Sequence, residues 1–422
     1  MKEILLQIKK YNFWENKDID LGFIRDSYLQ KILSYSTSNL IKVLVGQRRV
    51  GKSYILRQIL SNLISQGLPR KNTLYINREY TDFGFIKNSD DLEFLFSEYK
   101  KHFKPKGKIA IFIDEIQNIE NWEKFVNSHS QDFTEKCDIY ISGSNSKMLS
   151  GELATLLSGR YVEFEIFPFS FEEFTKVNSL AADKNSYVKY LSSGGMPELF
   201  ILPNDESRKN YISALKDTVF LRDIIQRYKI KDPNLLEDLF TYIVNNASSL
   251  LSANSIVKYY KGKGKTTTYD TISAYLEYMT DSFVIHKVDR YDIRGKETLA
   301  GNCKYYVNDL SFHNFLYSGF GYGIGYQLEN ILYLELRRMG FEVYIGTSRD
   351  KEIDFVAKKN DRVVYVQSCY LLADESTITR EYSPLESVKD NYEKYVVSLD
   401  DVKMPNKDGI QHLQAWEFSQ LQ

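Results

Sequence analysis

Short, mainly apolar runs alternate with amphipathic segments over the first part of the chain. The runs occupy residues 41–45, 73–77, 109–113 and 138–142. Runs of this length predict buried strands of a parallel sheet. Residues 55–63 and 89–95 carry apolar side chains at helical spacing, which predicts helices between the strands. Strands that alternate with helices indicate an α/β fold.

The pattern becomes mainly helical after residue 168. Ser170 and Glu173 have the spacing of a capping box, which predicts that a helix begins there. Helical periodicity continues through residues 187–191 and 211–228. We therefore expect a helical segment at residues 169–240, after an α/β domain at residues 1–168.

Residues 241–320 have the pattern of a winged helix. Four elements are expected in chain order: helices at residues 254–260 and 267–279, and strands at residues 283–291 and 304–308. A basic turn separates the two helices, and Thr266 is the expected cap of the second. The polar loop at residues 292–302 would join the two strands of the wing.

A glycine-rich loop follows the first apolar run and reads GQRRVGKS. In a phosphate-binding loop, backbone N–H groups close around phosphate oxygens, the lysine reaches the terminal phosphates and the serine hydroxyl ligates Mg²⁺. The expected nucleotide-binding residues are Gly46, Gln47, Arg48, Arg49, Val50, Gly51, Lys52, Ser53 and Tyr54. The alternative is a glycine-rich turn that caps an ordinary helix.

Two acidic residues, Asp114 and Glu115, end the apolar run at residues 109–113. A carboxylate at this point would hold Mg²⁺, and the next one would polarise the water that attacks the terminal phosphate. We therefore expect Ser53 and Asp114 as metal ligands, with Glu115 and Lys52 as catalytic residues. The alternative is an exposed acidic turn after an ordinary strand.

Two further positions are candidates for contact with the terminal phosphate. Ser144 or Asn145, after the run at residues 138–142, is the candidate sensor, although Ser and Asn also form ordinary turns. Arg160 precedes an alternating strand pattern and is the candidate arginine finger, for its own chain or for a neighbouring subunit. A surface arginine at the start of a strand is the alternative.

Composition narrows the class of protein. A chain of 422 residues with 43% hydrophobic and 26% charged residues is expected to form several soluble domains. No apolar run is long enough to cross a bilayer, so we expect a cytoplasmic protein with no membrane partner. The net charge of −1 argues against a wholly basic nucleic-acid binder. Cys137, Cys303 and Cys369 lack paired histidine spacing, so neither a disulfide framework nor a zinc site is expected.

Five strings together make the chain resemble bacterial and archaeal AAA-type P-loop ATPases that carry an uncharacterised C-terminal region. The strings are GQRRVGKS, IFIDEIQNIENWEKF, ISGSNSKMLS, LSGRYVEFEIFPFSFEEF and GGMPEL. The resemblance implies an ATPase core with an N-terminal lead-in at residues 1–168 and a helical lid at residues 169–240. It also implies a winged helix at residues 241–320 and a restriction-endonuclease-like α/β domain at residues 321–422.

The last of these segments resembles the PD-(D/E)XK nuclease core. Its expected elements are a helix after Gly325 and strands at residues 341–345, 352–357 and 363–370. The resemblance implies that Glu329 and Asp354 hold a metal, but Gln367 stands at the third acid and Cys369 at the lysine. The candidates for the missing ammonium are Lys389 and Lys394. A retained fold used for docking is therefore favoured over cleavage.

The preferred hypothesis is a regulatory switch or remodeller that binds and hydrolyses ATP with Mg²⁺. Double-stranded DNA is a candidate partner of the winged helix. A second copy of the chain or another protein is a further candidate partner of the protein. The candidate DNA contacts are Lys261, Lys263, Lys265 and Thr267. The alternatives are a winged helix that only packs on the core, a DNA-binding module stabilised by ATP, and a nuclease effector that uses Glu329 and Asp354.

Overall fold

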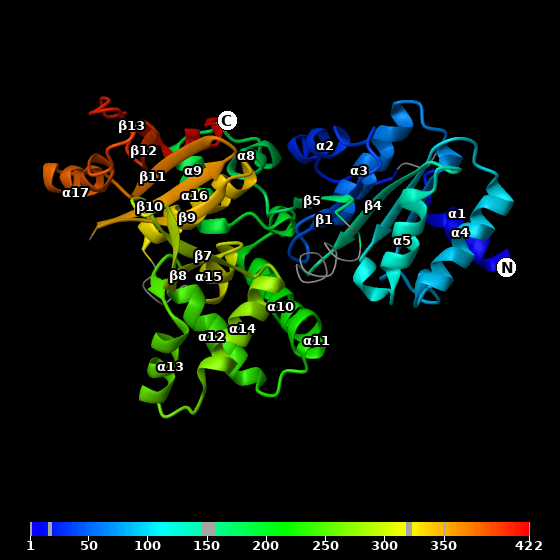
Figure 1. Cartoon of the computed structure of the whole chain (residues 1–422), viewed down its shortest axis with the longest axis horizontal. Helices are drawn as coiled ribbons and strands as arrows, with labels where there is room; N and C mark the ends of the chain where they lie inside the picture. The colour runs from blue at the N-terminus through cyan, green and yellow to red at the C-terminus, as the bar shows by residue number, and fades with distance from the viewer. Residues whose placement is uncertain are drawn as a thin grey trace. The chain divides into compact units, whose positions relative to one another are not determined.

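The computed structural model describes residues 2–15, 19–145, 157, 159–317, 323–349 and 351–421. Parts of the strings ISGSNSKMLS and LSGRYVEFEIFPFSFEEF therefore lie outside the described residues. The chain divides into two compact units, Met1–Ile166 and Phe167–Gln422 (Figure 1).

The first unit is built on a five-stranded parallel sheet with the order β2-β3-β4-β1-β5. Its strands are β1 (Ile41–Val45), β2 (Thr73–Asn77), β3 (Ile109–Asp114), β4 (Cys137–Gly143) and β5 (Tyr161–Glu165). Every residue of β1 to β4 is buried, because helices cover both faces. The predicted α/β fold with a parallel sheet is confirmed for this unit.

The helices of the first unit form two groups. They are α1 (Lys2–Tyr11), α2 (Asp26–Leu33), α3 (Lys52–Ser65), α4 (Ser89–Phe103) and α5 (Trp122–Gln131). Helix α2 packs on α3, whereas α1 and α5 both pack on α4. Figure 1 shows the two groups on opposite faces of the sheet. Right-handed crossovers require this arrangement, because the chain crosses the sheet one way through α3 and returns through α4 and α5.

The second unit contains an eight-stranded mixed sheet with the order β13-β12-β11-β10-β9-β7-β8-β6. Its strands are β6 (Leu250–Leu251), β7 (Ile285–Asp292), β8 (Glu297–Val307), β9 (Glu342–Ser348), β10 (Lys351–Lys359), β11 (Arg362–Cys369), β12 (Glu393–Ser398) and β13 (Ile410–Gln414). Strands β7 and β8 form an antiparallel hairpin, and β7 also pairs in parallel with β9. The hairpin predicted as a wing is thus continuous with the C-terminal strands.

Several helices of the second unit pack on this sheet, and others pack on neighbouring helices. They are α8 (Phe171–Asn178), α9 (Lys184–Ser193), α10 (Asp205–Thr218), α11 (Gln226–Tyr228), α12 (Pro233–Asn245), α13 (Ala253–Gly262), α14 (Tyr269–Asp281), α15 (Ser311–Leu316), α16 (Ile324–Arg338) and α17 (Glu375–Glu386). The capping box of α8 is confirmed, because Ser170 Oγ accepts from Glu173 N at 3.2 Å and Ser170 N donates to Glu173 Oε2 at 2.9 Å.

Two local predictions in the second unit are wrong. Thr268, not Thr266, caps α14, because Thr268 Oγ1 accepts a hydrogen bond from the backbone N–H of Thr271 at 3.2 Å. The polar loop is also shorter than expected, because β8 already begins at Glu297, which pairs with Asp292 of β7. A bulge after Asp289 lets the longer strand stay in register with the shorter one.

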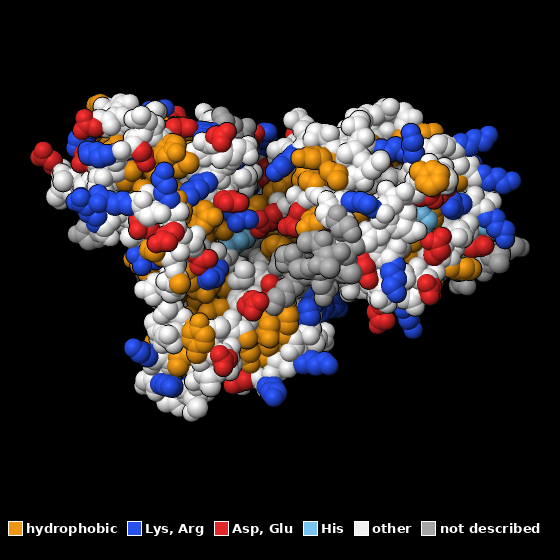
Figure 2. Space-filling model, viewed as in Figure 1, with side chains coloured by type: hydrophobic (Ala, Val, Ile, Leu, Met, Phe, Trp, Pro, Cys, Tyr) orange, Lys and Arg blue, Asp and Glu red, His pale blue; other side chains and the backbone are white. Residues whose placement is uncertain are grey.

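The structure bears on two features considered from composition, membrane-spanning segments and cysteine pairing. None of the described helices is long and apolar enough to cross a membrane. The three cysteines are buried and unpaired with one another, as expected. Figure 2 shows Lys and Arg side chains interspersed with Asp and Glu over the visible face, in keeping with the net charge of −1.

Candidate functional site

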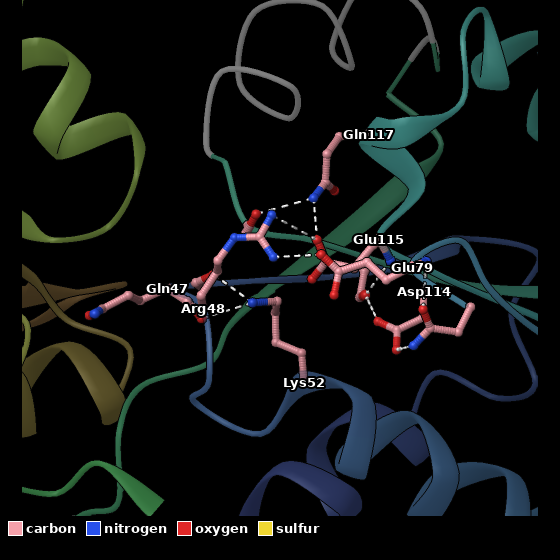
Figure 3. Close-up of polar contacts among 11 residues, drawn as sticks. Gln47, Arg48, Lys52, Glu79, Asp114, Glu115 and Gln117 are labelled. Carbon is pink, nitrogen blue, oxygen red and sulfur yellow. Dashed lines mark hydrogen bonds and ion pairs between the residues drawn. The ribbon is translucent and has the colours of Figure 1, made fainter. Parts of the chain in front are cut away.

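The phosphate-binding loop lies at the carboxyl end of β1 and leads directly into α3. Gly46 has φ 141°, and a Cβ there would lie 2.3 Å from the carbonyl oxygen of Ile166, so only glycine fits. Gly51, with φ 100°, precedes the first turn of α3. The ammonium of Lys52 donates hydrogen bonds of 2.8 Å to the carbonyl oxygens of Gly46 and Gln47. The Lys52 ammonium is therefore held by carbonyl groups of its own loop (Figure 3).

The carboxylate of Asp114 is held at the neighbouring strand end. Asp114 is fully buried, and three groups donate hydrogen bonds to it. They are the hydroxyl of Ser142, the hydroxyl of Tyr75 at 3.0 Å and the amide of Asn77 at 2.8 Å. These donors come from β2 and β4, on either side of β3. The sheet therefore orients Asp114, and its oxygens match the hard ligands that Mg²⁺ prefers.

Glu115 has an unusual backbone conformation. Its φ of 56° and ψ of 48° lie in the left-handed region, which is uncommon for a residue other than glycine. Its side chain is buried, and burial raises the pKa of the carboxyl, although the nearby Lys52 ammonium opposes that rise. Such a carboxyl is more basic than an exposed one, as a general base requires.

Gln117 links Glu115 to the candidate sensor strand, and sequence reasoning missed it. Its side-chain amide donates to Glu115 Oε2 and to Ser144 Oγ, the latter at 3.1 Å. Gly143 leaves room for this amide, since a Cβ there would lie 2.9 Å from Gln117 Oε1. Its position two residues after Glu115 is the only sequence signal. Ser144 and Asn145 are both buried beside this contact.

The other predicted loop residues have different surroundings. Arg48 lies between two acids, with Nη1 at 2.7 Å from Glu79 Oε1 and Nη2 at 3.9 Å from Glu115 Oε2; Figure 3 shows its guanidinium directed toward Glu115. Arg49 has a left-handed φ of 68°, and Val50 is buried. The Ser53 side chain is half-buried at the start of α3. Tyr54 is 38% exposed and turns away to pack against Gly22.

Arg160 lies at the opposite edge of the sheet from the loop. Its carbonyl oxygen accepts a hydrogen bond from the backbone N–H of Ile41, the first residue of β1, at 2.9 Å. The loop begins after Val45, the last residue of β1, so a strand length of roughly 13 Å separates the two backbones. This distance exceeds the reach of an arginine side chain. Of the two alternatives for Arg160, the strand geometry disfavours contact with the phosphates of its own chain, and contact with those of a neighbouring subunit stays a prediction.

The predicted nuclease residues meet in the second unit. Helix α16 and strand β10 provide Glu329 and Asp354, and Gln367 on β11 accepts a hydrogen bond from Asp354 N at 3.3 Å. Burial raises the pKa of Glu329 to about 7, opposed by Lys304, and burial also raises the pKa of Asp354. A cavity of about 580 Å³ is lined by these three residues together with Ser368, Arg380 and Glu381.

Lys304 supplies an ammonium at this site, and sequence reasoning missed it. Its Nζ lies 2.9 Å from Glu329, 2.8 Å from Glu352 and 4.0 Å from Asp354. Lys304 comes from β8, the second strand of the hairpin. Neither lysine proposed for this role lines the cavity. Lys394 lies on β12 and pairs with Asp390, and Lys389 is exposed in the loop after α17. The sheet order that joins β8 to the C-terminal strands could not be read from the sequence.

The four candidate DNA-contacting residues differ in exposure to solvent. Lys261, Lys263 and Lys265 are exposed around the end of α13. Lys265 forms an ion pair with Asp238, and Lys263 lies over the ring of Tyr259 at 4.6 Å. Thr267 is buried, so its hydroxyl is not presented to a phosphate and the prediction for this residue is wrong. DNA contact by the three lysines stays a prediction.

Two family models match parts of this chain, and two relatives align with it over most of its length. The AAA domain model matches residues 38–175, and a model of a domain of unknown function matches residues 184–321. An uncharacterized protein of Haemophilus influenzae is 35% identical over 391 residues, which cover 92% of this chain and 96% of that protein. An uncharacterized protein of Methanocaldococcus jannaschii is 31% identical over 416 residues, covering 94% and 86%. A Walker-type ATPase of Pyrococcus abyssi has a similar solved structure, with a TM-score of 0.45, 18% identity and coverage of 70% and 96%.

Proposed function

Because this chain belongs to the family of AAA-type P-loop ATPases, we propose that it binds ATP with Mg²⁺ at the loop of residues 46–53 and hydrolyses it. The observation that carries the proposal is the buried, left-handed Glu115 at the same sheet edge as the Lys52 loop. Gln117 connects Glu115 to Ser144, which supports a sensor role for Ser144. An ordinary acidic turn would need neither the strained backbone nor these contacts.

The residues have separable roles in this reaction. The loop amides and the Lys52 ammonium bind the phosphates, and Asn145 and Ser144 contact the terminal one. Glu115 accepts a proton from the water whose oxygen attacks the γ-phosphorus, while the bond from that phosphorus to the bridging oxygen breaks. Mg²⁺, when bound through Ser53 and Asp114, supplies charge neutralisation at the phosphate oxygens. Arg160 of a neighbouring copy adds a positive charge there.

The biological output of hydrolysis is a regulatory switch or a remodelling step. To move a switch from almost wholly off to almost wholly on, ATP must bind one state about 10⁴-fold, or about 5.5 kcal/mol, more tightly than the other. Association with double-stranded DNA through the exposed Lys261 and Lys263 is part of this proposal. Salt-dependent binding of a DNA duplex that is weakened by Lys263→Ala would support it, and binding insensitive to salt would count against it.

Replacing Lys52 tests nucleotide binding directly. Lys52→Ala should abolish measurable phosphate release and weaken ATP binding, because the ammonium that neutralises the terminal phosphates is lost. The measurement is calorimetric titration with ATP and Mg²⁺, together with a phosphate-release assay. Lys71→Ala, at an exposed residue of the 3-10 helix before β2, is the matched control and should behave as the native chain. Equal ATP affinity and equal rates in all three proteins would remove the proposal.

A second candidate function, cleavage of phosphodiester bonds in the second unit, is favoured by Lys304. Glu329, Asp354 and Gln367 offer oxygen donors, and Lys304 provides the ammonium missing at Cys369. The charges needed to neutralise a phosphate and to activate water are thus present on neighbouring elements. Mg²⁺ or Mn²⁺, held by Glu329 and Asp354, would supply Lewis acidity when bound.

The nuclease proposal predicts a specific loss of cutting. With Mg²⁺ or Mn²⁺, the native chain should cut single- or double-stranded DNA or RNA, whereas Lys304→Met and Asp354→Ala should each lose at least about 100-fold of that rate, the usual scale for removing one charged group from a site. Lys389→Met, at an exposed lysine, is the control. Gel assays of all four proteins decide the matter. No cutting by the native chain, or cutting that survives both substitutions, would reject the proposal.

A further inference from the structure

We propose that His129, Glu135 and Cys137 form a binding site for a transition-metal ion of the Zn²⁺ class in the ATPase unit. His129 lies in the last turn of α5, Glu135 lies in the following loop, and Cys137 is the first residue of β4. One ring nitrogen of His129, one carboxylate oxygen of Glu135 and the Cys137 sulfur lie within 4.8 Å of one another. The short connection between α5 and β4 thus brings three different ligand types together.

His129 is the residue that points to a ligand. Its side chain is only 8% exposed, and Nε2 lies 2.7 Å from Glu93 Oε2. Nδ1 is buried and, among the residues that the structure describes, has no hydrogen-bond partner. Burial removes this atom from water, so a ligand that takes its lone pair would restore the lost interaction. Because Nε2 pairs with Glu93, Nδ1 is the nitrogen that would take the ion.

The surroundings of His129 have the form expected of a metal site. A histidine that binds a metal through one nitrogen usually donates its other N–H to a carboxylate, which fixes the tautomer and the ring orientation. Glu93 on α4 is that carboxylate. The rings of Phe96 and Phe125 pack against the imidazole, with centroids 4.6 and 4.5 Å away. The ring is therefore held in place before any ion binds.

The three ligand types select the class of ion. Thiolate and imidazole favour Zn²⁺ and similar ions, whereas Mg²⁺ and Ca²⁺ prefer sites made only of oxygen. Zn²⁺ bonds of about 2.3 Å to sulfur and about 2.0 Å to nitrogen put tetrahedral ligand atoms roughly 3.5 Å apart, so small side-chain rotations must close the site. Binding also displaces the thiol proton, since burial raises the pKa of Cys137 to about 12.

A cavity beside Cys137 would provide the route to the site, and a water molecule would provide the fourth ligand. Of the three ligands, Cys137 lines a cavity of about 860 Å³ together with Ser130, Asp132 and Lys136, so an ion and a water molecule would approach the site from the side of the thiol. Lys100 Nζ lies 2.9 Å from Glu135 Oε2, but a single bond from the carboxylate to the metal needs only one oxygen. Three protein ligands and one water complete a four-coordinate Zn²⁺ site of the open kind.

The test uses the full chain, stripped of metal and kept reduced, with Co²⁺ as a spectroscopic probe. Co²⁺ should bind and give the near-ultraviolet absorption of a cobalt–thiolate bond, and one equivalent of Zn²⁺ should remove that absorption. Cys137→Ser should abolish the absorption, and His129→Ala should weaken Zn²⁺ binding at least about 10-fold. Glu93→Gln, behind the histidine, should weaken it about 10- to 100-fold without touching the ion.

Matched controls separate this site from other parts of the chain. Cys303→Ser and Cys369→Ser replace the two other buried thiols and should keep the cobalt–thiolate absorption. Asp354→Ala should leave it unchanged, which separates the site from the acids of the second unit. Absence of the absorption in the native chain, or its survival in Cys137→Ser, would overturn the proposal. So would an unchanged Zn²⁺ affinity in Glu93→Gln, a variant that removes only one charge from a partly exposed residue.

Discussion

Glu115→Gln should lower the rate of ATP hydrolysis by about 10²- to 10⁴-fold, the range that general-base groups supply. Glutamine keeps the size of the side chain and can still contact Gln117 and Arg48, but it cannot accept a proton from water. ATP binding should change little, because Lys52 and the loop contact the phosphates. Single-turnover phosphate release and calorimetric titration, on the native and variant chains, separate these two effects.

The pH dependence of the hydrolysis rate is an independent test of Glu115 as the general base. Burial raises the pKa of Glu115, so its carboxylate becomes protonated at a higher pH than an exposed glutamate as the solution is acidified. The native rate should therefore fall on acidification, and the small residual rate of Glu115→Gln should lack that fall. Exposed Glu120→Gln is the matched control. Rapid hydrolysis by Glu115→Gln would rule out Glu115 as the base.

Asp138→Ala should reduce the stability of the ATPase unit by about 3–5 kcal/mol, the cost of leaving a buried charge without its partner. Asp138 on β4 lies 2.6 Å from the ammonium of Lys42 on β1, and the two side chains are 1% and 0% exposed. Burial already lowers the pKa of Lys42, while Asp138 opposes that effect. Without Asp138 the ammonium would lose its counter-charge inside the sheet. Hydrogen–deuterium exchange of the β1 and β4 amides measures the loss.

Two comparisons test whether the ion pair itself causes this effect. Replacing both partners, with Lys42→Met and Asp138→Leu together, should recover the part of the loss that comes from the buried ammonium. The part that comes from Lys108 and Tyr140, which also contact Asp138 at 2.8 and 3.0 Å, should stay lost. Lys9→Met breaks an exposed pair with Glu15, in which the side chains are 49% and 44% exposed, and should leave the same amides unchanged. A double variant as unstable as Asp138→Ala would show that the two charges are not coupled.

The sequence predicted the strands of the ATPase unit well because each is short, apolar and buried on both faces. The expected runs at residues 41–45 and 73–77 coincide with β1 and β2. The gathering of the loop, Asp114 and Ser144 at one edge also followed, because parallel strands end at the same edge of a sheet. The same rule would have placed Arg160, which precedes its strand, at the other edge.

Contacts between elements distant in the chain were beyond sequence reasoning. Lys304 lies 25 residues before Glu329, and their contact exists only because β8 joins the sheet on which α16 packs. Gln117 reaches Ser144 across a similar distance in the chain. His129 escaped notice because its metal-site partners have no regular spacing, and its unsatisfied nitrogen is visible only in three dimensions.

The pairing of β7 with β9 has a practical consequence for anyone who divides the chain. A fragment of residues 321–422 would lack β7, so β9 would become an edge strand whose backbone groups at residues 345–347 lose their partners on one side. Bare strand margins recruit strands from other molecules and promote aggregation. Insolubility of such a fragment would therefore reflect the cut itself, and the C-terminal strands should be expressed within the whole second unit, Phe167–Gln422.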